Sequence, residues 1–166
     1  MDRQLLKILY ETYYNEIVQY LFFLSRRKEI AEDLAQETFL KALLALPDHH
    51  TNMRAWIYMV ARNLYYNYRK KEQKISPLDE LVEQIRAGTD PGIKILQNER
   101  NQILMQALDK LEDRAREVLL LQYFGNLSQK EIAAILHLTP QNVRVLAFRA
   151  KKKVREYMEV NEYDVL

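Results

Sequence analysis

The chain has 166 residues, carries a formal net charge of +2, and contains three glycines, four prolines and no cysteine. This composition allows one ordinary domain or two small ones, and it excludes disulfide bonds, thiol nucleophiles and cysteine-type zinc sites. No run of 18 apolar residues is present and the N-terminus does not resemble a signal peptide, so we expect a soluble, cytoplasmic protein.

The small net charge hides strong local patterning. Residues 54–74 and 144–155 are rich in lysine and arginine, whereas residues 29–37 and 79–90 are acidic. Two separate basic segments indicate one polyanionic partner that is contacted twice, and the acidic segments indicate a different partner.

The first two predicted helices cover residues 3–25 and 29–46. Apolar residues recur at helical spacing across the first helix, and Pro47 ends the second. The first turns of the second helix carry acidic side chains that complement the positive end of the helix dipole: Glu29, Glu32, Asp33 and Glu37.

A third helix is predicted from the loop at residues 48–52 to about Lys71, with Thr51 or Asn52 as its N-cap. Its predicted core stripe consists of Ile57, Val60, Ala61, Leu64 and Tyr68. Its other side carries aromatic rings among cations, namely Tyr58, Arg62, Tyr65, Tyr66, Arg69 and Lys70. Rings stack on unpaired bases and cations bind phosphates, so this side predicts nucleic-acid contact, although a single tyrosine would more often belong to the edge of a core.

Residues 72–92 lack helical periodicity and hold Pro77, Gly88, Pro91 and Gly92, so we interpret them as a linker with at most a short acidic helix at residues 78–85. Helical spacing resumes at Ile95 and continues to Leu111, and a further helix is expected over residues 113–124. The sequence therefore predicts an all-α protein with two small helical domains. They cover residues 1–71 and 93–160, and a tail follows at residues 161–166.

A helix-turn-helix motif is predicted near the C-terminus. Ser128 and Glu131 have the spacing of a capping box at the start of a short helix, and His137 interrupts its pattern. Thr139 and Pro140 then start a second helix, as its N-cap and its first residue. Two short helices joined by a tight turn, the second of them basic, are typical of a motif whose second helix lies in a DNA major groove.

This second helix separates into two predicted faces. The buried stripe consists of Val143, Leu146, Ala147, Ala150, Val154 and Tyr157. The outer face consists of Gln141, Arg144, Val145, Phe148, Lys151, Lys152 and Arg155. Arginine and glutamine pair with base edges, apolar groups meet thymine methyls and lysine binds phosphate, so the outer face predicts a recognition helix. A solvated basic helix is the simpler alternative for such a face taken alone.

The order of these segments resembles bacterial RNA polymerase sigma factors of the extracytoplasmic-function (ECF) group over nearly the whole chain. Residues 31–43 (AEDLAQETFLKAL) resemble the region-two segment that binds the clamp helices of the polymerase β′ subunit. Residues 55–71 (AWIYMVARNLYYNYRKK) resemble the part that melts and reads the minus-ten element, and residues 107–154 resemble region four, which reads the minus-thirty-five element. The resemblance implies a non-enzymatic subunit that directs core polymerase to promoters, in a stress or envelope response.

The resemblance also assigns roles to single residues. The polymerase-facing set is Asp33, Gln36, Glu37 and Phe39. The minus-ten set is Trp56, Tyr58, Arg62, Asn63, Tyr65, Tyr66 and Arg69. Asn63 would hold a base, the loop at residues 48–53 would form the wall of a pocket for that flipped base, and Trp56 taken alone would more often be a core residue. The minus-thirty-five set is Ser128, Lys130, Gln141, Arg144, Phe148, Arg149, Lys151 and Lys152.

The implied partners are core RNA polymerase, through its β′ clamp helices and β flap, promoter DNA, and an anti-sigma factor that in relatives is often membrane-bound. No cofactor, metal or small-molecule substrate is expected, and the three histidines, His49, His50 and His137, lack ligand or triad spacing. The acidic linker residues Asp79, Glu80 and Glu83 would lie in the nucleic-acid path near the active centre of the polymerase.

The sequence departs from the family pattern in two places that matter for the motif. His137 stands where relatives usually have glycine, and Leu146 stands where they often have arginine, which leaves fewer polar groups to read bases. Two alternatives stay open at this point. A stand-alone helix-turn-helix regulator would bind palindromic duplexes without polymerase, and an RNA-binding helical protein would prefer single-stranded RNA.

Overall fold

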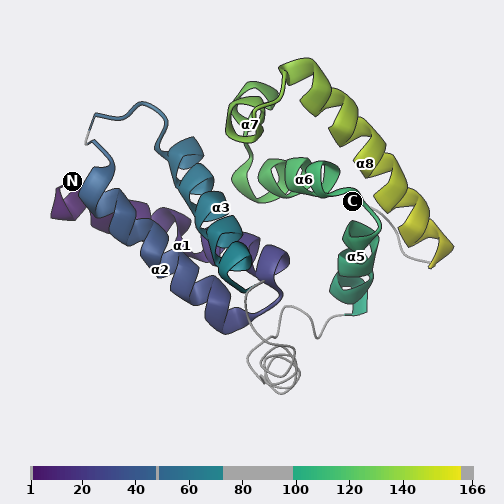
Figure 1. Cartoon of the computed structure of the whole chain (residues 1–166), viewed down its shortest axis with the longest axis horizontal. Helices are drawn as coiled ribbons and strands as arrows, with labels where there is room; N and C mark the ends of the chain where they lie inside the picture. The colour runs from purple at the N-terminus through teal and green to yellow at the C-terminus, as the bar shows by residue number, and fades with distance from the viewer. Residues whose placement is uncertain (1, 48, 73–98, 162–166) are drawn as a thin grey trace. The chain divides into compact units, whose positions relative to one another are not determined.

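The computed structural model describes residues 2–47, 49–72 and 99–161, and the chain divides into two compact units between Gly92 and Ile93 (Figure 1). All regular elements within these residues are α-helices, as the sequence predicts. Most of the predicted linker, with its acidic helix at residues 78–85, lies outside the described residues. So do the start of the predicted helix at Ile95, Asp48 and the last five residues.

The first unit contains α1 (Arg3–Ser25), α2 (Lys28–Ala45) and α3 (Met53–Glu72). The turn from α1 to α2 is tight because Arg26 adopts the left-handed conformation, with φ 63°, and its N–H donates to the Phe22 carbonyl at 2.7 Å. Arg27 follows immediately as the residue that precedes α2. A connection this short returns α2 along α1 as an antiparallel pair.

Side chains from all three helices form the core of the first unit. The fully buried apolar and aromatic ones are Ile17, Tyr20, Leu21, Ala31, Ala35, Ala42, Ile57, Tyr58 and Ala61. Burial of each large apolar side chain contributes about 1.5–3 kcal/mol. Thr38 is the one uncharged polar side chain buried among them in the described residues, and its hydroxyl donates to the Leu34 carbonyl at 2.8 Å. The three-helix arrangement leaves the outer faces of α2 and α3 available for partners.

The second unit contains α5 (Glu99–Asp109), α6 (Asp113–Gly125), α7 (Gln129–Leu136) and α8 (Pro140–Val160). Its core is built from Val118, Leu121, Ile132, Leu136 and Val143. These residues bring α6, α7 and α8 together, and α5 packs against α8 (Figure 1).

Two arginines of α6 donate to backbone carbonyls at or just beyond the ends of neighbouring helices. Arg116 donates from Nε to the Leu108 carbonyl at 3.0 Å and from Nη2 to the Leu111 carbonyl at 3.1 Å. Arg114 donates from Nη1 to the Leu136 carbonyl at 3.1 Å and lies 3.7 Å from the buried carboxylate of Glu117. Carbonyls at a helix C-terminus lack intrahelical partners, so these contacts fix the ends of α5 and α7 relative to α6.

Candidate nucleic-acid and protein-docking surfaces

The predicted helix-turn-helix motif is present, and its caps match the sequence pattern. Ser128 Oγ accepts the Glu131 N–H at 3.1 Å, and Glu131 Oε1 accepts the Ser128 N–H at 2.8 Å. α7 ends at His137 in the left-handed conformation, with φ 57°. Thr139 Oγ1 accepts the Asn142 N–H at 3.1 Å, and Pro140 is the first residue of α8. These hydrogen bonds set where α8 begins.

The inner stripe of α8 largely follows the prediction. Val143, Ala147, Ala150 and Val154 are buried, as expected from their spacing. The predicted burial of Leu146 and Tyr157 is wrong, since both are only half-buried, and Met158 is buried instead. Tyr157 keeps its polar end outward because its hydroxyl donates to Gln106 Oε1 at 3.0 Å, whereas Met158 continues the stripe four residues after Val154.

The outer face of α8 is fully available. All eight residues of the predicted minus-thirty-five set are exposed, including Ser128 and Lys130 of the α7 region. Phe148 is the most unusual of them, because 72% of this large apolar side chain faces solvent. Val145, one turn before Arg149, is also exposed. An exposed phenylalanine among cations contributes nothing to the core, and DNA contact by this set stays a prediction.

The outer face of α3 carries part of the predicted minus-ten set. Asn63 and Arg69 are exposed, and Trp56, Arg62 and Tyr66 are half-buried. The Arg62 guanidinium lies over the Tyr66 ring, 4.7 Å from its centroid. This cation–π pair holds both side chains in place at the surface, with the positive charge of Arg62 over the face of the Tyr66 ring.

The placement of Tyr58 on this outer face is wrong. Its side chain is fully buried, its ring meets Tyr20 edge-on at 5.2 Å between centroids, and its hydroxyl donates to Glu16 Oε1 at 3.0 Å. The same Glu16 oxygen accepts from Arg54 Nη1 at 2.6 Å. Burial raises the pKa of Tyr58 well above its ordinary value of 10.0, and the nearby Glu16 carboxylate raises it further. Tyr58 therefore belongs to the core.

Tyr65 is also a correction, for the same reason. It is 8% exposed, and its hydroxyl donates to the Leu24 carbonyl at 3.0 Å. Tyr58 and Tyr65 are two helical turns apart, so they share the side of α3 that meets α1. The prediction that Val60 and Tyr68 belong to the core is wrong, since both are only half-buried. Tyrosine rings bury readily when their hydroxyls find partners. Helical spacing alone therefore does not decide whether a tyrosine lies in the core or at the surface.

The loop before α3 is ordered by local hydrogen bonds at its second half. The Asn52 N–H donates to His50 Nδ1 at 3.0 Å, and Asn52 Oδ1 accepts the Ala55 N–H at 3.2 Å. Of the two predicted caps, Asn52 is therefore the one that caps α3. Capture of a flipped base by this loop stays a prediction.

The outer face of α2 presents carboxylates beside apolar groups. Asp33, Gln36 and Glu37 are exposed as predicted, but Phe39 is 4% exposed and turns inward, where its ring meets Tyr10 at 5.2 Å. Phe39 lies four residues after Ala35 and so belongs to the buried stripe. Our sequence analysis missed Leu40 and Leu44, which are 55% and 77% exposed. Their positions one and two turns beyond Glu37, outside the core stripe, were the available signal.

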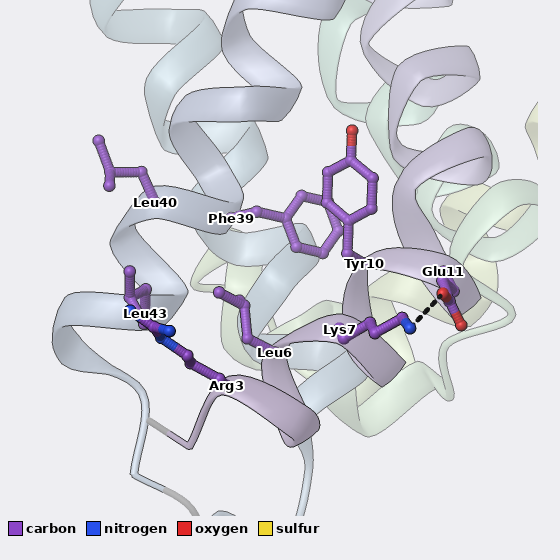
Figure 2. Close-up of a pocket in the computed structure, with 8 residues that line it drawn as sticks. All are labelled: Arg3, Leu6, Lys7, Tyr10, Glu11, Phe39, Leu40 and Leu43. Atoms are coloured by element: carbon purple, nitrogen blue, oxygen red, sulfur yellow. Dashed lines mark ion pairs between the residues drawn. The ribbon is translucent and has the colours of Figure 1, made fainter.

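A pocket of about 420 Å³ opens between the start of α1 and the end of α2, and Leu40 is part of its lining (Figure 2). Its apolar walls come from Leu6, Tyr10, Phe39, Leu40 and Leu43. Charged side chains also line it, namely Arg3, Lys7 and Glu11, of which Lys7 and Glu11 form an exposed ion pair at 4.0 Å. Tyr10 stacks on Tyr14 at 4.5 Å, and burial together with Tyr10 raises the pKa of Tyr14.

The described residues contain no cluster of histidine, aspartate or glutamate side chains that would bind a metal ion. No described helix is long and apolar enough to cross a membrane. Three helix surfaces carry the exposed groups described above: carboxylates with apolar groups on α2, and cations with rings on α3 and on α8.

Comparison with known proteins identifies both units. Residues 9–75 match the family model for Sigma-70 region 2, and residues 101–154 match that for Sigma-70, region 4. The chain is 33% identical over 163 residues to the RNA polymerase sigma factor YlaC of Bacillus subtilis, with 94% of this chain and 93% of YlaC covered. It is 29% identical over 151 residues to the ECF RNA polymerase sigma factor SigM of the same organism, with 89% and 91% covered.

Two solved structures share the fold. The sigma factor RpoE in complex with the anti-sigma factor NepR, from Bartonella quintana, has a TM-score of 0.70 and 22% identity, with 93% of this chain and 96% of that chain covered. CnrH in complex with the cytosolic domain of CnrY has a TM-score of 0.67 and 23% identity, with 96% and 90% covered. Because the sequence matches span both units, a stand-alone helix-turn-helix regulator is not favoured. The chain belongs to the Sigma-70 family, as a sigma factor of the ECF group, and it directs promoter-specific transcription initiation by RNA polymerase.

Proposed function

We propose that three separate surfaces divide the work of initiation. The outer face of α2, with the adjoining pocket, docks on core polymerase, the outer face of α3 binds the minus-ten element, and the outer face of α8 binds the minus-thirty-five element. One observation supports the assignment of α8 to DNA binding more strongly than any other. The exposed side of α8 combines arginine, glutamine, lysine and the 72% exposed Phe148 on a helix whose other side is buried.

Docking on polymerase uses charge and apolar area together. Asp33 and Glu37 attract a basic surface, while Leu40 and Leu44 supply apolar groups that lose water on contact. By the family resemblance, the receiving surface is the pair of β′ clamp helices, and region four meets the β flap. The carboxylates also keep this face from binding DNA, because they repel phosphate.

Promoter melting is assigned to α3 and the loop before it. Cations such as Arg62 and Arg69 hold the backbone of the non-template strand, and Asn63 with the loop at residues 48–53 takes a flipped base. Unstacking a base costs about a few kcal/mol. Simultaneous contact at the second element offsets that cost, because tethering raises the effective concentration of each contact. The protein itself catalyses no covalent step, which resides in the polymerase.

An anti-sigma factor is the proposed negative regulator. The solved structure of RpoE is a complex with an anti-sigma factor, and a regulator that covers Leu40, Leu44 and the pocket on this chain would block polymerase docking. A protein with this role acts where polymerase is, in the cytoplasm, and is held at the membrane when its anti-sigma factor is membrane-bound.

The test is in vitro transcription with purified core enzyme, followed by mapping of the transcript start sites. We expect initiation at discrete sites that share two upstream elements, and loss of core binding in the Asp33→Lys/Glu37→Lys variant. The control is Glu112→Lys, which reverses an exposed charge in the second unit and should leave core binding within about twofold. Binding of palindromic duplexes without polymerase, or core binding unaffected by the double reversal, would refute the proposal.

A further inference from the structure

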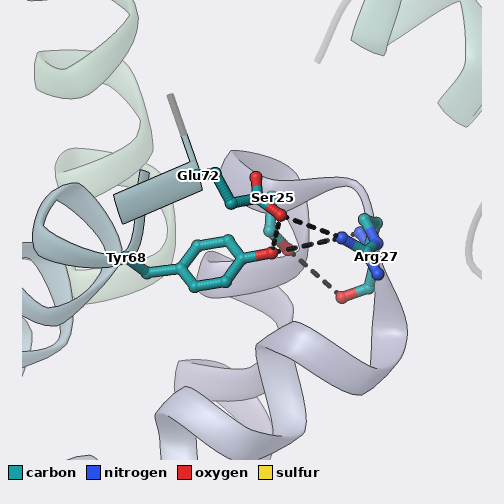
Figure 3. Close-up of polar contacts among 4 residues, drawn as sticks. All are labelled: Ser25, Arg27, Tyr68 and Glu72. Atoms are coloured by element: carbon teal, nitrogen blue, oxygen red, sulfur yellow. Dashed lines mark hydrogen bonds and ion pairs between the residues drawn. The ribbon is translucent and has the colours of Figure 1, made fainter. Parts of the chain in front are cut away.

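A polar cluster joins the C-terminal end of α3 to the turn between α1 and α2 (Figure 3). Arg27 Nη1 donates to the Tyr68 hydroxyl at 3.1 Å and to Glu72 Oε1 at 3.3 Å, and the Tyr68 hydroxyl also donates to Glu72 Oε1. The Arg27 and Glu72 side chains are 19% and 34% exposed, so this ion pair is partly shielded from water. Such a pair is stronger than one on an open surface.

A glutamate at the C-terminal end of α3 is unfavourable unless a cation pairs with it, as Arg27 pairs with Glu72. It is the only acidic residue of α3, and it follows Arg69, Lys70 and Lys71 in the last turn. The C-terminus of a helix carries partial negative charge, which favours cations and disfavours a carboxylate. Arg27 offsets this repulsion, so the contact between Arg27 and Glu72 is what makes a carboxylate acceptable there.

The partner side of the cluster is held by local hydrogen bonds. Arg27 follows the left-handed Arg26, and its own N–H donates to Ser25 Oγ at 3.2 Å, while the Ser25 hydroxyl also contacts the Arg27 carbonyl. The Leu24 carbonyl, in the last turn of α1, accepts the Tyr65 hydroxyl. Three side chains on one side of α3 therefore contact the end of α1 and the turn that follows it: those of Tyr65, Tyr68 and Glu72. Helix ends fray readily, and these contacts hold the last two turns of α3 in place.

We infer that Arg27 and Glu72 are positioning residues for the minus-ten surface. They contact no DNA themselves. They fix the last turn of α3, so that the exposed cations Arg69 and Lys70 stay in register with Arg62 and Asn63 further along the helix. Binding groups must be held to within about 0.5 Å to act together, and a frayed end would lose the phosphate contacts while the base contacts remained. This inference rests on the proposed function of α3.

Two substitutions with opposite charge changes test it. Arg27→Gln removes a positive charge and Glu72→Gln removes a negative one. If the two residues acted on DNA only through long-range charge, Glu72→Gln would speed promoter opening and Arg27→Gln would slow it. A positioning role predicts that both variants slow opening, by about three- to tenfold, because either one breaks the same charge-assisted contact.

The measurement uses holoenzyme on a linear promoter fragment taken from the mapped start sites, with permanganate reactivity of unpaired thymines as the signal for opening. The charge-exchanged variant Arg27→Glu/Glu72→Arg should recover most of the opening rate. Lys110→Gln and Glu112→Gln make the same charge changes at exposed positions of the second unit and should have no effect. The salt dependence of opening should also weaken in both single variants, since phosphate contacts are lost. A smaller fraction of folded protein alone would not change that slope.

The outcomes separate this inference from the proposed function. If Arg69→Ala and Lys70→Ala leave opening unchanged, the assignment of α3 to the minus-ten element fails. If those variants slow opening but Arg27→Gln and Glu72→Gln do not, or act in opposite directions, the positioning role is overturned and the proposed function stands. Slow opening in both variants without rescue by the charge exchange would also overturn it.

Discussion

α3 and α8 are both basic, amphipathic and close in length, at 20 and 21 residues, yet they are attached to their units by different means. α8 packs through small and medium apolar side chains such as Ala147 and Val154, and its charged groups all lie outside. α3 packs through apolar residues such as Ile57 and also through tyrosines whose hydroxyls reach partners on α1, namely Glu16 and the Leu24 carbonyl.

The difference matters because it decides which substitutions affect stability and which affect binding. On α8 the two roles belong to separate residues, since the inner stripe has no polar function and the outer face has no role in the core. On α3 adjacent tyrosines have different roles. Tyr65 is buried in the core, and Tyr66 lies at the surface with Arg62. Buried apolar area positions both helices, through residues such as Ile57 and Ala61 on α3, and α3 adds hydrogen bonds from its buried tyrosines.

The largest expected effect is the difference in stability between substitutions at two tyrosines of α3. Tyr58→Ala removes a fully buried ring and should lower the free energy of unfolding of the first unit by about 3–5 kcal/mol. Tyr66→Ala removes a half-buried surface ring and should cost less than about 1 kcal/mol. Urea unfolding followed by the fluorescence of Trp56, the only tryptophan, reports on this unit. Equal losses for the two variants would contradict the burial of Tyr58.

The second prediction concerns pH and applies to the first unit. The pKa of Tyr58 is raised in the folded protein, so the folded state keeps this proton after the unfolded chain has lost it. Ionisation of Tyr58 therefore leaves the free energy of unfolding unchanged below about pH 10. Above that pH it lowers the free energy of unfolding by about 1.4 kcal/mol per pH unit. Tyr58→Phe should remove this part of the slope and Tyr66→Phe should not. Tyr14, whose pKa is also raised, contributes equally to all three proteins.

On α8 the corresponding substitution should change binding alone. Phe148→Ala should weaken holoenzyme binding to the minus-thirty-five element by about tenfold, the size of one lost base contact, and leave unfolding within about 0.5 kcal/mol. Val160→Ala is the control, because Val160 is an 82% exposed apolar residue at the far end of the same helix. Gel-shift titration on matched and mutated elements measures the effect. A large loss of stability in Phe148→Ala would contradict the separation of roles on α8.

The smallest effect lies in the turn before α8. His137 has φ 57°, a conformation that glycine adopts without the crowding of a Cβ atom. His137→Gly should therefore stabilise the second unit by about 0.5–1 kcal/mol. Asn126→Gly, at the other left-handed position of this unit, should gain less because asparagine tolerates the conformation. Calorimetric unfolding of the full chain gives both values, and destabilisation by His137→Gly would show that the histidine side chain has a contact of its own.

The sequence predicted the helices well because their ends carry explicit signals. Ser128, Thr139 and Pro140 mark the motif by their side-chain chemistry, and each occupies the position that its type favours. The faces of α8 were also predictable, because its side chains are either small and apolar or charged. The roles of its exposed residues in DNA binding stay predictions.

The faces of α3 and α2 were harder to predict, for identifiable reasons. Tyr58 and Tyr65 have both an apolar ring and a polar end, so their location depends on whether Glu16 and the Leu24 carbonyl are within reach, which no local pattern reveals. Phe39 was assigned to the surface by family resemblance, although its spacing from Ala35 places it inside. The cluster of Arg27 with Glu72 joins residues far apart in the chain, so only the tertiary structure brings it to light.

The independence of the outer face of α8 has a consequence for how promoter preference changes over evolution. The end of α7 is fixed to α6 through the Leu136 carbonyl, and the buried stripe of α8 needs none of the outward side chains. Gln141, Arg144 and Phe148 can therefore be exchanged as a set without refolding the unit. A library randomised at these three positions should retain folded members that recognise altered upstream sequences. Such variants would provide orthogonal regulators from a single scaffold.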